Sequence, residues 1–232
     1  MKTEIRFDVD NPNEFLSKEN YDSLGIATIF EGNRLTGLQM LVEHNEESGH
    51  ADIVRQARDK IVPLRALIRF YGGPALQLGA VYTQAIEPLS SARIGLGFVK
   101  LEAALVKPIP LPPPATIASL SGEVTRQLGW FNAAEDSSWV IEKIRDYYEV
   151  LELEDQLTGA SYKPKDEMKH LRDAVSHPRL DRNPKAVKYL QDNLGTDHID
   201  PNNDTHLQFL EGKVELLRTA ARIVLEAKLP AR

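Results

Sequence analysis

Cysteine is absent from this sequence of 232 residues. Disulfide bonds and thiolate chemistry are therefore excluded, while the redox compartment is left open. The opening residues 1–6 have no apolar core of the kind that marks a secretory signal, and no apolar run reaches the length of a membrane span. We therefore expect a cytoplasmic protein that is not embedded in a membrane.

Several motifs that mark known chemistry are also missing. There is no phosphate-binding glycine loop, no Gly-x-Ser-x-Gly and no His-Glu-x-x-His, so nucleotide hydrolysis by those routes and zinc proteolysis are unsupported. Residues 43–50 hold two histidines and several carboxylates, but their spacing matches no metal signature and favours a solvated loop. Residues 200–211 imitate a calcium loop, yet Thr205 stands where that loop requires glycine. We expect no metal and no cofactor.

The composition that is present is ordinary for a globular protein, with 42% hydrophobic and 27% charged residues. The net charge of −6 argues against wholesale nucleic-acid binding. The charge is unevenly distributed, because residues 163–188 hold eight cations and four anions, a window of +4 that leaves −10 for the rest. Such a window can focus an anionic ligand. A solvated helical surface accounts equally well for the charge alone.

The hydrophobic pattern of residues 1–107 predicts a mixed α/β domain with antiparallel strands. Apolar residues alternate at Ile5, Phe7 and Val9, as in a half-buried strand over 3–9. The other predicted strands are 24–30, 35–42, 80–86 and 92–106, the first two of these joined by a turn at 31–34. A helix is predicted over 51–71, and Pro63 is expected to kink or split it.

Prolines concentrate in one place, since residues 107–114 contain five of the 14 in the chain. Such a segment favours extended polyproline geometry and spaces domains semi-rigidly. The composition also changes across it. We therefore predict a linker at 108–114, a first domain at 1–107 and a second domain at 115–232.

The apolar periodicity of the second domain predicts five amphipathic helices joined by mostly short loops. This arrangement is typical of a helical bundle. The overall fold class is therefore α+β. The expected helix signals are an apolar stripe from Ile117 to Leu128, an N-cap at Asp136, a helix over 165–177 stopped by Pro178, an Asn183-Pro184 start with a stop at Gly195, and a capping box that begins at Thr205.

The segment 171–178, Leu-Arg-Asp-Ala-Val-Ser-His-Pro, is the densest concentration of chemistry in the chain. Arg172 and His177 are separated by four residues near a helix end, and polar Asp173 follows the arginine. With the surrounding helical bundle, this segment resembles the HEPN domain family, whose members carry an Arg-x(4–6)-His motif. The resemblance covers roughly residues 115–232 and says nothing about the first domain.

The resemblance implies metal-independent RNA cleavage, in which the ribose 2′-hydroxyl attacks the adjacent phosphate. His177 would act as general base or acid, since imidazole titrates near neutral pH. Arg172 would hold the phosphate and stabilise charge that develops in the transition state. Asp173 lies one turn before His177 and could orient its ring.

Helix geometry adds a constraint on this site. Arg172 and His177 are five positions apart, or about 140° around a regular helix axis, so one straight helix does not aim both at one phosphate. Either Pro178 releases the last turn or two protomers pool their residues. Because domains of the family commonly pair with their motifs facing, we predict a homodimer through the bundle.

A structural interpretation of the same residues stays open. His177 can be a cation that stabilises a helix C-terminus, and Arg172 can form an ion pair with a nearby carboxylate. In the functional interpretation, RNA contacts are expected from the neighbouring cations and from a tyrosine predicted to be exposed between lysines. These residues are Lys169, Arg179, Arg182, Lys185, Lys188 and Tyr189.

The leading hypothesis is therefore an RNA-directed endoribonuclease of defence, toxin or stress-response type, which an antitoxin or other regulatory protein could control. The alternative is a non-catalytic module that binds RNA, nucleotide or protein, with a first domain that senses a ligand. A purely structural dimerisation domain comes third.

Overall fold

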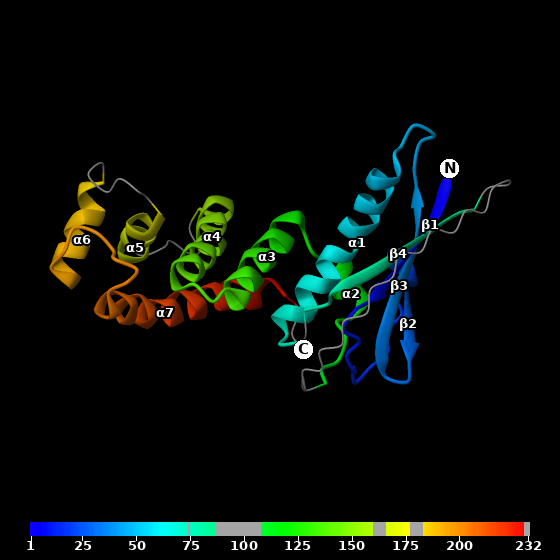
Figure 1. Ribbon diagram of the computed structural model, residues 1–232, viewed down its shortest axis with the longest axis horizontal. Coiled ribbons are helices and arrows are strands. Elements are labelled where there is room, and N and C mark those ends of the chain that lie inside the picture. Colours follow the sequence, from blue (N-terminus) through cyan, green and yellow to red (C-terminus); the bar gives the residue numbers. More distant parts are fainter. Residues whose placement is uncertain (74, 87–107, 160–165, 177–182, 230–232) are drawn as a thin grey trace. The chain divides into compact units, whose positions relative to one another are not determined.

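The computed structural model describes residues 1–73, 75–86, 108–159, 166–176 and 183–229. The chain divides into two compact units, Met1–Leu120 and Ser121–Arg232. The first contains an antiparallel four-stranded sheet, and the second is helical (Figure 1). The α+β class predicted from the sequence is confirmed. The predicted strand at 92–106 lies outside the described residues.

The N-terminal sheet has the strand order β2-β3-β1-β4. Its strands are β1 (Lys2–Val9), β2 (Ile26–Glu31), β3 (Arg34–Glu43) and β4 (Leu78–Ala85). β1 buries every second residue, as its alternation predicts. β2 and β3 form a hairpin in which Glu31 pairs with Arg34, and Gly32 in the turn has a φ of +63° that favours glycine.

Helix α1 (His50–Phe70) contacts β1 and β3 through a buried stripe that includes Ile53, Ala57 and Ile61. The predicted split at Pro63 is wrong, because α1 continues as one helix through that position. Proline removes one helical hydrogen bond and crowds the preceding turn. The fully buried neighbours Ile61 and Leu64 hold this part of the helix in the core, so tertiary packing outweighs the local preference.

The proline-rich segment packs on the N-terminal unit and is not a free spacer. The carbonyl of Ile109 accepts a hydrogen bond from Leu16 at 3.1 Å, and the Tyr21 hydroxyl donates to the carbonyl of Pro112 at 2.8 Å. Leu111 is buried. A short 3₁₀ helix, η1 (Asp22–Leu24), and helix α2 (Pro114–Ala118) complete this unit. The division between the units therefore falls after Leu120, later than the predicted boundary at 108–114.

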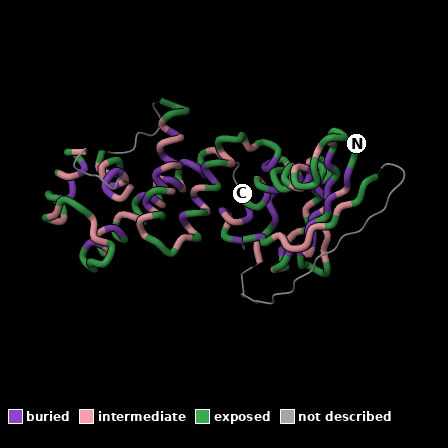
Figure 2. The backbone as a smooth tube through the Cα atoms, turned by 45° about the horizontal axis from the view of Figure 1, so that its top comes forward, coloured by how far each residue is buried: buried purple, intermediate pink, exposed green. Residues whose placement is uncertain are grey.

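Within its described residues the C-terminal unit has five helices, each with buried positions along its length (Figure 2). They are α3 (Gly122–Asp136), α4 (Val140–Thr158), α5 (Asp166–Ser176), α6 (Pro184–Leu194) and α7 (Asp204–Lys228). α4 contacts α3, α5 and α7, and α6 contacts α5. α4 therefore contacts three of the other four helices, and α6 joins them through α5.

Several helix limits differ from the predicted ones. The stripe from Ile117 to Leu128 is divided between α2 and α3, and Ser121 caps α3 by accepting a hydrogen bond from Val124 at 3.2 Å. Asp136 ends α3 and does not begin α4. Asn203, and not Thr205, caps α7. The predicted start of α6 is confirmed, since Asn183 accepts from Ala186 and Gly195 ends the helix with a φ of +67°.

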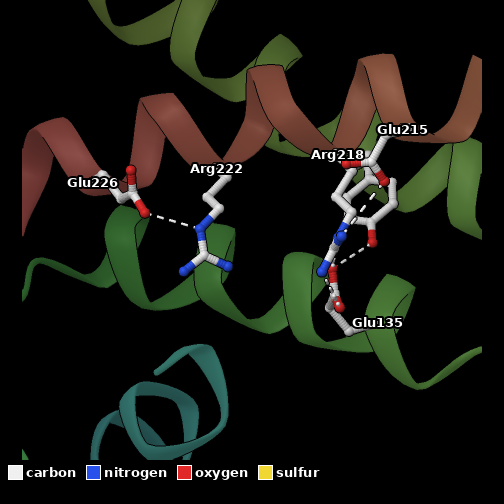
Figure 3. Close-up of polar contacts among 6 residues, drawn as sticks. Glu135, Glu215, Arg218, Arg222 and Glu226 are labelled. Carbon is white, nitrogen blue, oxygen red and sulfur yellow. Dashed lines mark hydrogen bonds and ion pairs between the residues drawn. The ribbon is translucent and has the colours of Figure 1, made fainter. Parts of the chain in front are cut away.

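A partly exposed ion pair joins α7 to α3. Arg218 donates to both carboxylate oxygens of Glu135, at 2.6 and 3.2 Å (Figure 3). The Tyr147 hydroxyl of α4 donates to the same carboxylate at 2.7 Å. One glutamate therefore connects three helices through a bidentate arginine contact.

Candidate functional site

Arg172 lies in the last two turns of α5, against α4. Its Nη2 atom is 3.4 Å from Oε1 of Glu152, and its guanidinium carbon is 4.7 Å from the ring centroid of Tyr148. Its Nε atom is 3.2 Å from Oδ1 of Asp173, although the N–H is not aligned for a hydrogen bond. The side chain is 19% exposed. Arg172 therefore makes an ion pair with a nearby carboxylate, as the structural interpretation predicts.

The helical spacing of α4 and α5 produces this arrangement. Tyr148, Glu152 and Asp155 follow one another at steps of four and three, so they share one face of α4. Arg172 and Ser176 share a face of α5 for the same reason. Because α4 and α5 are in contact, polar residues meet along a helix–helix contact that is usually apolar.

This contact contains buried polar atoms that form no hydrogen bond. They are Oδ1 of Asp155, Nε of Arg172 and Oγ of Ser176. Buried polar atoms are nearly always paired in folded proteins, so three unpaired ones in this part of the unit are unusual.

Asp173 is 8% exposed and accepts a hydrogen bond from the side chain of Asn183 at 2.8 Å. Asn183 also caps α6, so this carboxylate connects the end of α5 to the start of α6. His177, Arg179 and Arg182 lie outside the described residues. The predicted contact between Asp173 and His177 therefore stays a prediction.

The predicted RNA-contacting residues divide into two groups. Lys169, Lys185 and Lys188 are exposed, as expected. Tyr189 is 9% exposed, so the prediction of an exposed stacking platform is wrong. Its hydroxyl lies 3.4 Å from Oε1 of Glu167, and its ring lies 6.2 Å from that of Phe209. Burial raises the pKa of the Tyr189 hydroxyl.

Tyr189 is buried because it lies three positions after buried Ala186 and next to buried Leu190. An i, i+3 pair shares one helix face, so the face that Ala186 presents to the bundle also contains the tyrosine. The tyrosine is a packing residue of α6.

Two carboxyl groups of α4 lie close to this site. Burial raises the pKa of Glu149 above its usual value of 4.5, and the Glu152 carboxylate adds to the effect. Burial likewise raises the pKa of Asp146, although its ion pair with Arg145 acts in the opposite direction. Perturbed carboxyl groups beside an arginine are typical of functional sites. No motif in the sequence marks these two carboxyl groups.

A second cationic surface was also missed. Arg55, Arg58, Arg65 and Arg69 recur along α1 at intervals of three, seven and four residues. These intervals keep side chains on one side of a helix. The spacing is visible in the sequence, so a search for charge periodicity along the predicted helix would have found it.

The described residues contain no group of three or more histidine, aspartate or glutamate side chains that could hold a metal ion. His44 contacts Thr3 and the carbonyl of Asn45, and Asn203 uses its side chain to cap α7. The two polar segments considered from the sequence therefore have structural roles.

Comparisons with models of protein families, with curated proteins and with solved structures find no match for this chain. Within the part of the chain that the structure describes, no helix is long and apolar enough to cross a membrane.

Proposed function

We propose that the C-terminal unit is an RNA-directed module of HEPN type, and that Arg172 and His177 cleave RNA without a metal ion. The observation that supports this proposal best is the environment of Arg172. Its guanidinium is held by an aromatic ring and two carboxylates, so it is already oriented before a ligand arrives. Because a guanidinium has five N–H groups, two carboxylates do not exhaust its donors.

The proposed reaction is a transesterification at one phosphate. The ribose 2′-oxygen forms a bond to phosphorus as its proton passes to a base, and the bond from phosphorus to the 5′-oxygen breaks as that oxygen gains a proton. His177 supplies one of these transfers, from one copy or from each of two. Arg172 stabilises the charge that develops on the phosphate oxygens. Exposed Lys169, Lys185 and Lys188 are suited to contact the flanking phosphates.

The ion pairs that Arg172 makes within the chain favour a second candidate function. Glu152 and Asp173 already neutralise much of its charge, and this weakens its attraction for a phosphate. In this alternative the unit binds RNA, nucleotide or a regulatory protein without cutting, and the N-terminal unit senses a ligand.

We further propose that the helical unit forms a homodimer through α7. Gly212, Leu216, Thr219 and Ile223 form an exposed stripe along α7. A two-fold axis between Thr219 and Ala220 would pair Leu216 with Ile223 of the second copy. It would also bring Arg222, which pairs with Glu226 of its own chain (Figure 3), near the second copy's Glu215. We expect such a protein to act in the cytoplasm, under control by an antitoxin or other regulator.

The test incubates the full chain with mixed RNA in excess chelator, beside Arg172→Ala and His177→Ala variants. Arg126→Ala is the matched control, because Arg126 is an exposed arginine of the same unit, on α3. Cleavage that survives chelation, vanishes in both variants and persists in the control supports the nuclease. RNA retention without cleavage, weakening steeply with salt, supports the binding module and overturns the nuclease.

A further inference from the structure

The cationic side of α1 is formed by Arg55, Arg58, Arg65 and Arg69, which we call the arginine face. On a regular helix these four side chains fall within an arc of about 80°. Val62 lies within the same arc and is exposed. The buried stripe that contacts the sheet occupies a different arc and includes Ile53, Ala57, Ile61 and Leu64. The arginine face therefore points away from the sheet along the length of α1.

The arginines of this face are only partly neutralised. Arg55 pairs with Asp52 at 2.7 Å, and Arg69 donates to the carbonyl of Gly73 at 3.4 Å. Among the residues that the structure describes, Arg58 and Arg65 form no ion pair with a carboxylate. The residue Arg65 is exposed as a whole, yet neighbouring atoms desolvate its guanidinium. This desolvation and repulsion from Arg58 lower the pKa of Arg65.

This concentration of charge contrasts with the rest of its unit. Residues 1–120 contain 12 cations and 14 anions, a net charge of −2. Within α1 there are five cations and two anions, a net charge of +3, so the remainder of the unit is at −5. Like charges on one helix face cost stability, and Arg58 and Arg65 have no carboxylate partner among the described residues. An anionic ligand would remove that cost.

The chemistry of the face indicates which anion it fits. From Arg55 to Arg69 the helix rises about 21 Å, so the ligand must present negative charges over a comparable length. Arginine binds phosphate oxygens through a planar fork that lysine lacks. Val62, at the centre of the face, offers an apolar contact to sugar or base. A polymer with regularly spaced phosphates and apolar surface between them is a nucleic-acid strand.

We propose that the arginine face of α1 binds the phosphate backbone of single-stranded RNA. The choice of RNA over other phosphate polymers rests on the proposed function of the C-terminal unit. The arginine face then gives the N-terminal unit a task that the sequence left undetermined, which is to hold the strand that the C-terminal unit acts on.

The test measures binding of a fluorescently labelled single-stranded RNA across a series of salt concentrations. All chains carry His177→Ala so that the RNA is not consumed. The test variant adds Arg58→Gln and Arg65→Gln. The matched control adds Lys18→Gln and Arg34→Gln, which remove two exposed cations from the same unit outside α1.

We expect the test variant to lose about tenfold or more in affinity near physiological salt, while the control changes little. The slope of log affinity against log salt should fall in magnitude by about 1.4, because each lost phosphate contact on a single strand removes about 0.7. An unchanged slope and affinity in the test variant overturns the proposal. So does an equal loss in the control, which would indicate attraction by net charge alone.

A competition with poly-glutamate separates RNA from an acidic protein partner. If poly-glutamate at equal charge concentration displaces the RNA and depends equally on Arg58 and Arg65, the assignment to RNA is overturned. The proposals for the two units also fail separately. Cleavage by the wild type with no effect of the α1 variant removes only this inference, and α1-dependent binding without any cleavage removes only the nuclease.

Discussion

The carboxylate of Asp173 accepts a hydrogen bond from the side-chain amide of Asn183 at 2.8 Å. The other end of the same amide, Oδ1, accepts from the backbone N–H of Ala186 and caps α6. One asparagine therefore uses donor and acceptor together to connect α5 and α6. The carboxylate beside Arg172 is fixed by the start of the next helix.

Replacing Asn183 by alanine removes both interactions. Loss of a cap costs about 1 kcal/mol, and loss of a hydrogen bond to a charged group costs about 1.5–3 kcal/mol. We expect Asn183→Ala to lower the free energy of unfolding by about 2.5–4 kcal/mol. Urea unfolding followed by tryptophan fluorescence measures this, because both tryptophans, Trp130 and Trp139, lie in the C-terminal unit.

Asn183→Ser separates the two effects, since serine can cap a helix but has no amide to reach Asp173. We expect it to recover about 1 kcal/mol relative to alanine. A serine variant as stable as the wild type would show that the bond to Asp173 contributes nothing.

A buried ion pair in the same unit gives a second prediction. Glu154 is 6% exposed, pairs with Lys228 and accepts a hydrogen bond from Gln127 at 3.2 Å. Lys228→Met leaves the carboxylate buried without its cation, and this should cost about 3–5 kcal/mol in the same fluorescence assay. Adding Glu154→Gln should restore much of the loss, because the buried group is then neutral.

Lys188→Met is the matched control for this pair, since Lys188 is exposed on α6. We expect a change within about 0.5 kcal/mol there. If Lys228→Met is equally mild, the Glu154 carboxylate does not depend on its partner.

Local sequence signals correctly predicted the features that depend on residues close together in the chain, which are a strand and the ends of a helix. The alternation of Ile5, Phe7 and Val9 marked β1, and Asn183 with Gly195 marked both ends of α6. These signals work because caps and strand alternation depend on a few adjacent residues. The fold class followed from them.

What failed depends on contacts between distant residues. Pro63 stays helical because the core holds its neighbours, and the proline-rich segment packs on Tyr21 and Leu16 although its composition resembles a spacer. Tyr189 is buried although it was expected to be exposed, because it shares a helix face with buried Ala186. The network of Arg172 with Glu152 and Tyr148 joins positions at least 20 residues apart, which no local spacing reveals.

The carboxyl groups beside Arg172 predict a pH dependence. Because the folded-state pKa of Glu149 is raised above 4.5, the folded chain binds this proton more tightly than the unfolded chain. The stabilisation is complete below pH 4.5 and is lost as pH rises through the folded-state pKa. Glu149→Gln cannot lose a proton. Its unfolding free energy relative to wild type should therefore rise with pH from about 4.5 upward and then level off.

Urea titrations at a series of pH values test this, with Glu211→Gln as the matched control because Glu211 is exposed on α7. A difference between Glu149→Gln and wild type that falls as pH rises would contradict burial as the cause. The same variant also tests the candidate site. If Glu149 takes part in proton transfer, Glu149→Gln should reduce RNA cleavage without weakening RNA binding.

The exposed stripe of α7 predicts how the proposed dimer is broken. Leu216 and Ile223 are 43% and 61% exposed, and the proposed two-fold axis pairs them, so a charge at either position would be buried against an apolar partner. Wild type should sediment at twice 26.0 kDa, whereas Leu216→Glu and Ile223→Glu should sediment as monomers. Leu157→Glu, at an exposed leucine of α4, should leave the dimer intact. A monomeric wild type, or a control that dissociates equally, would exclude α7 as the interface.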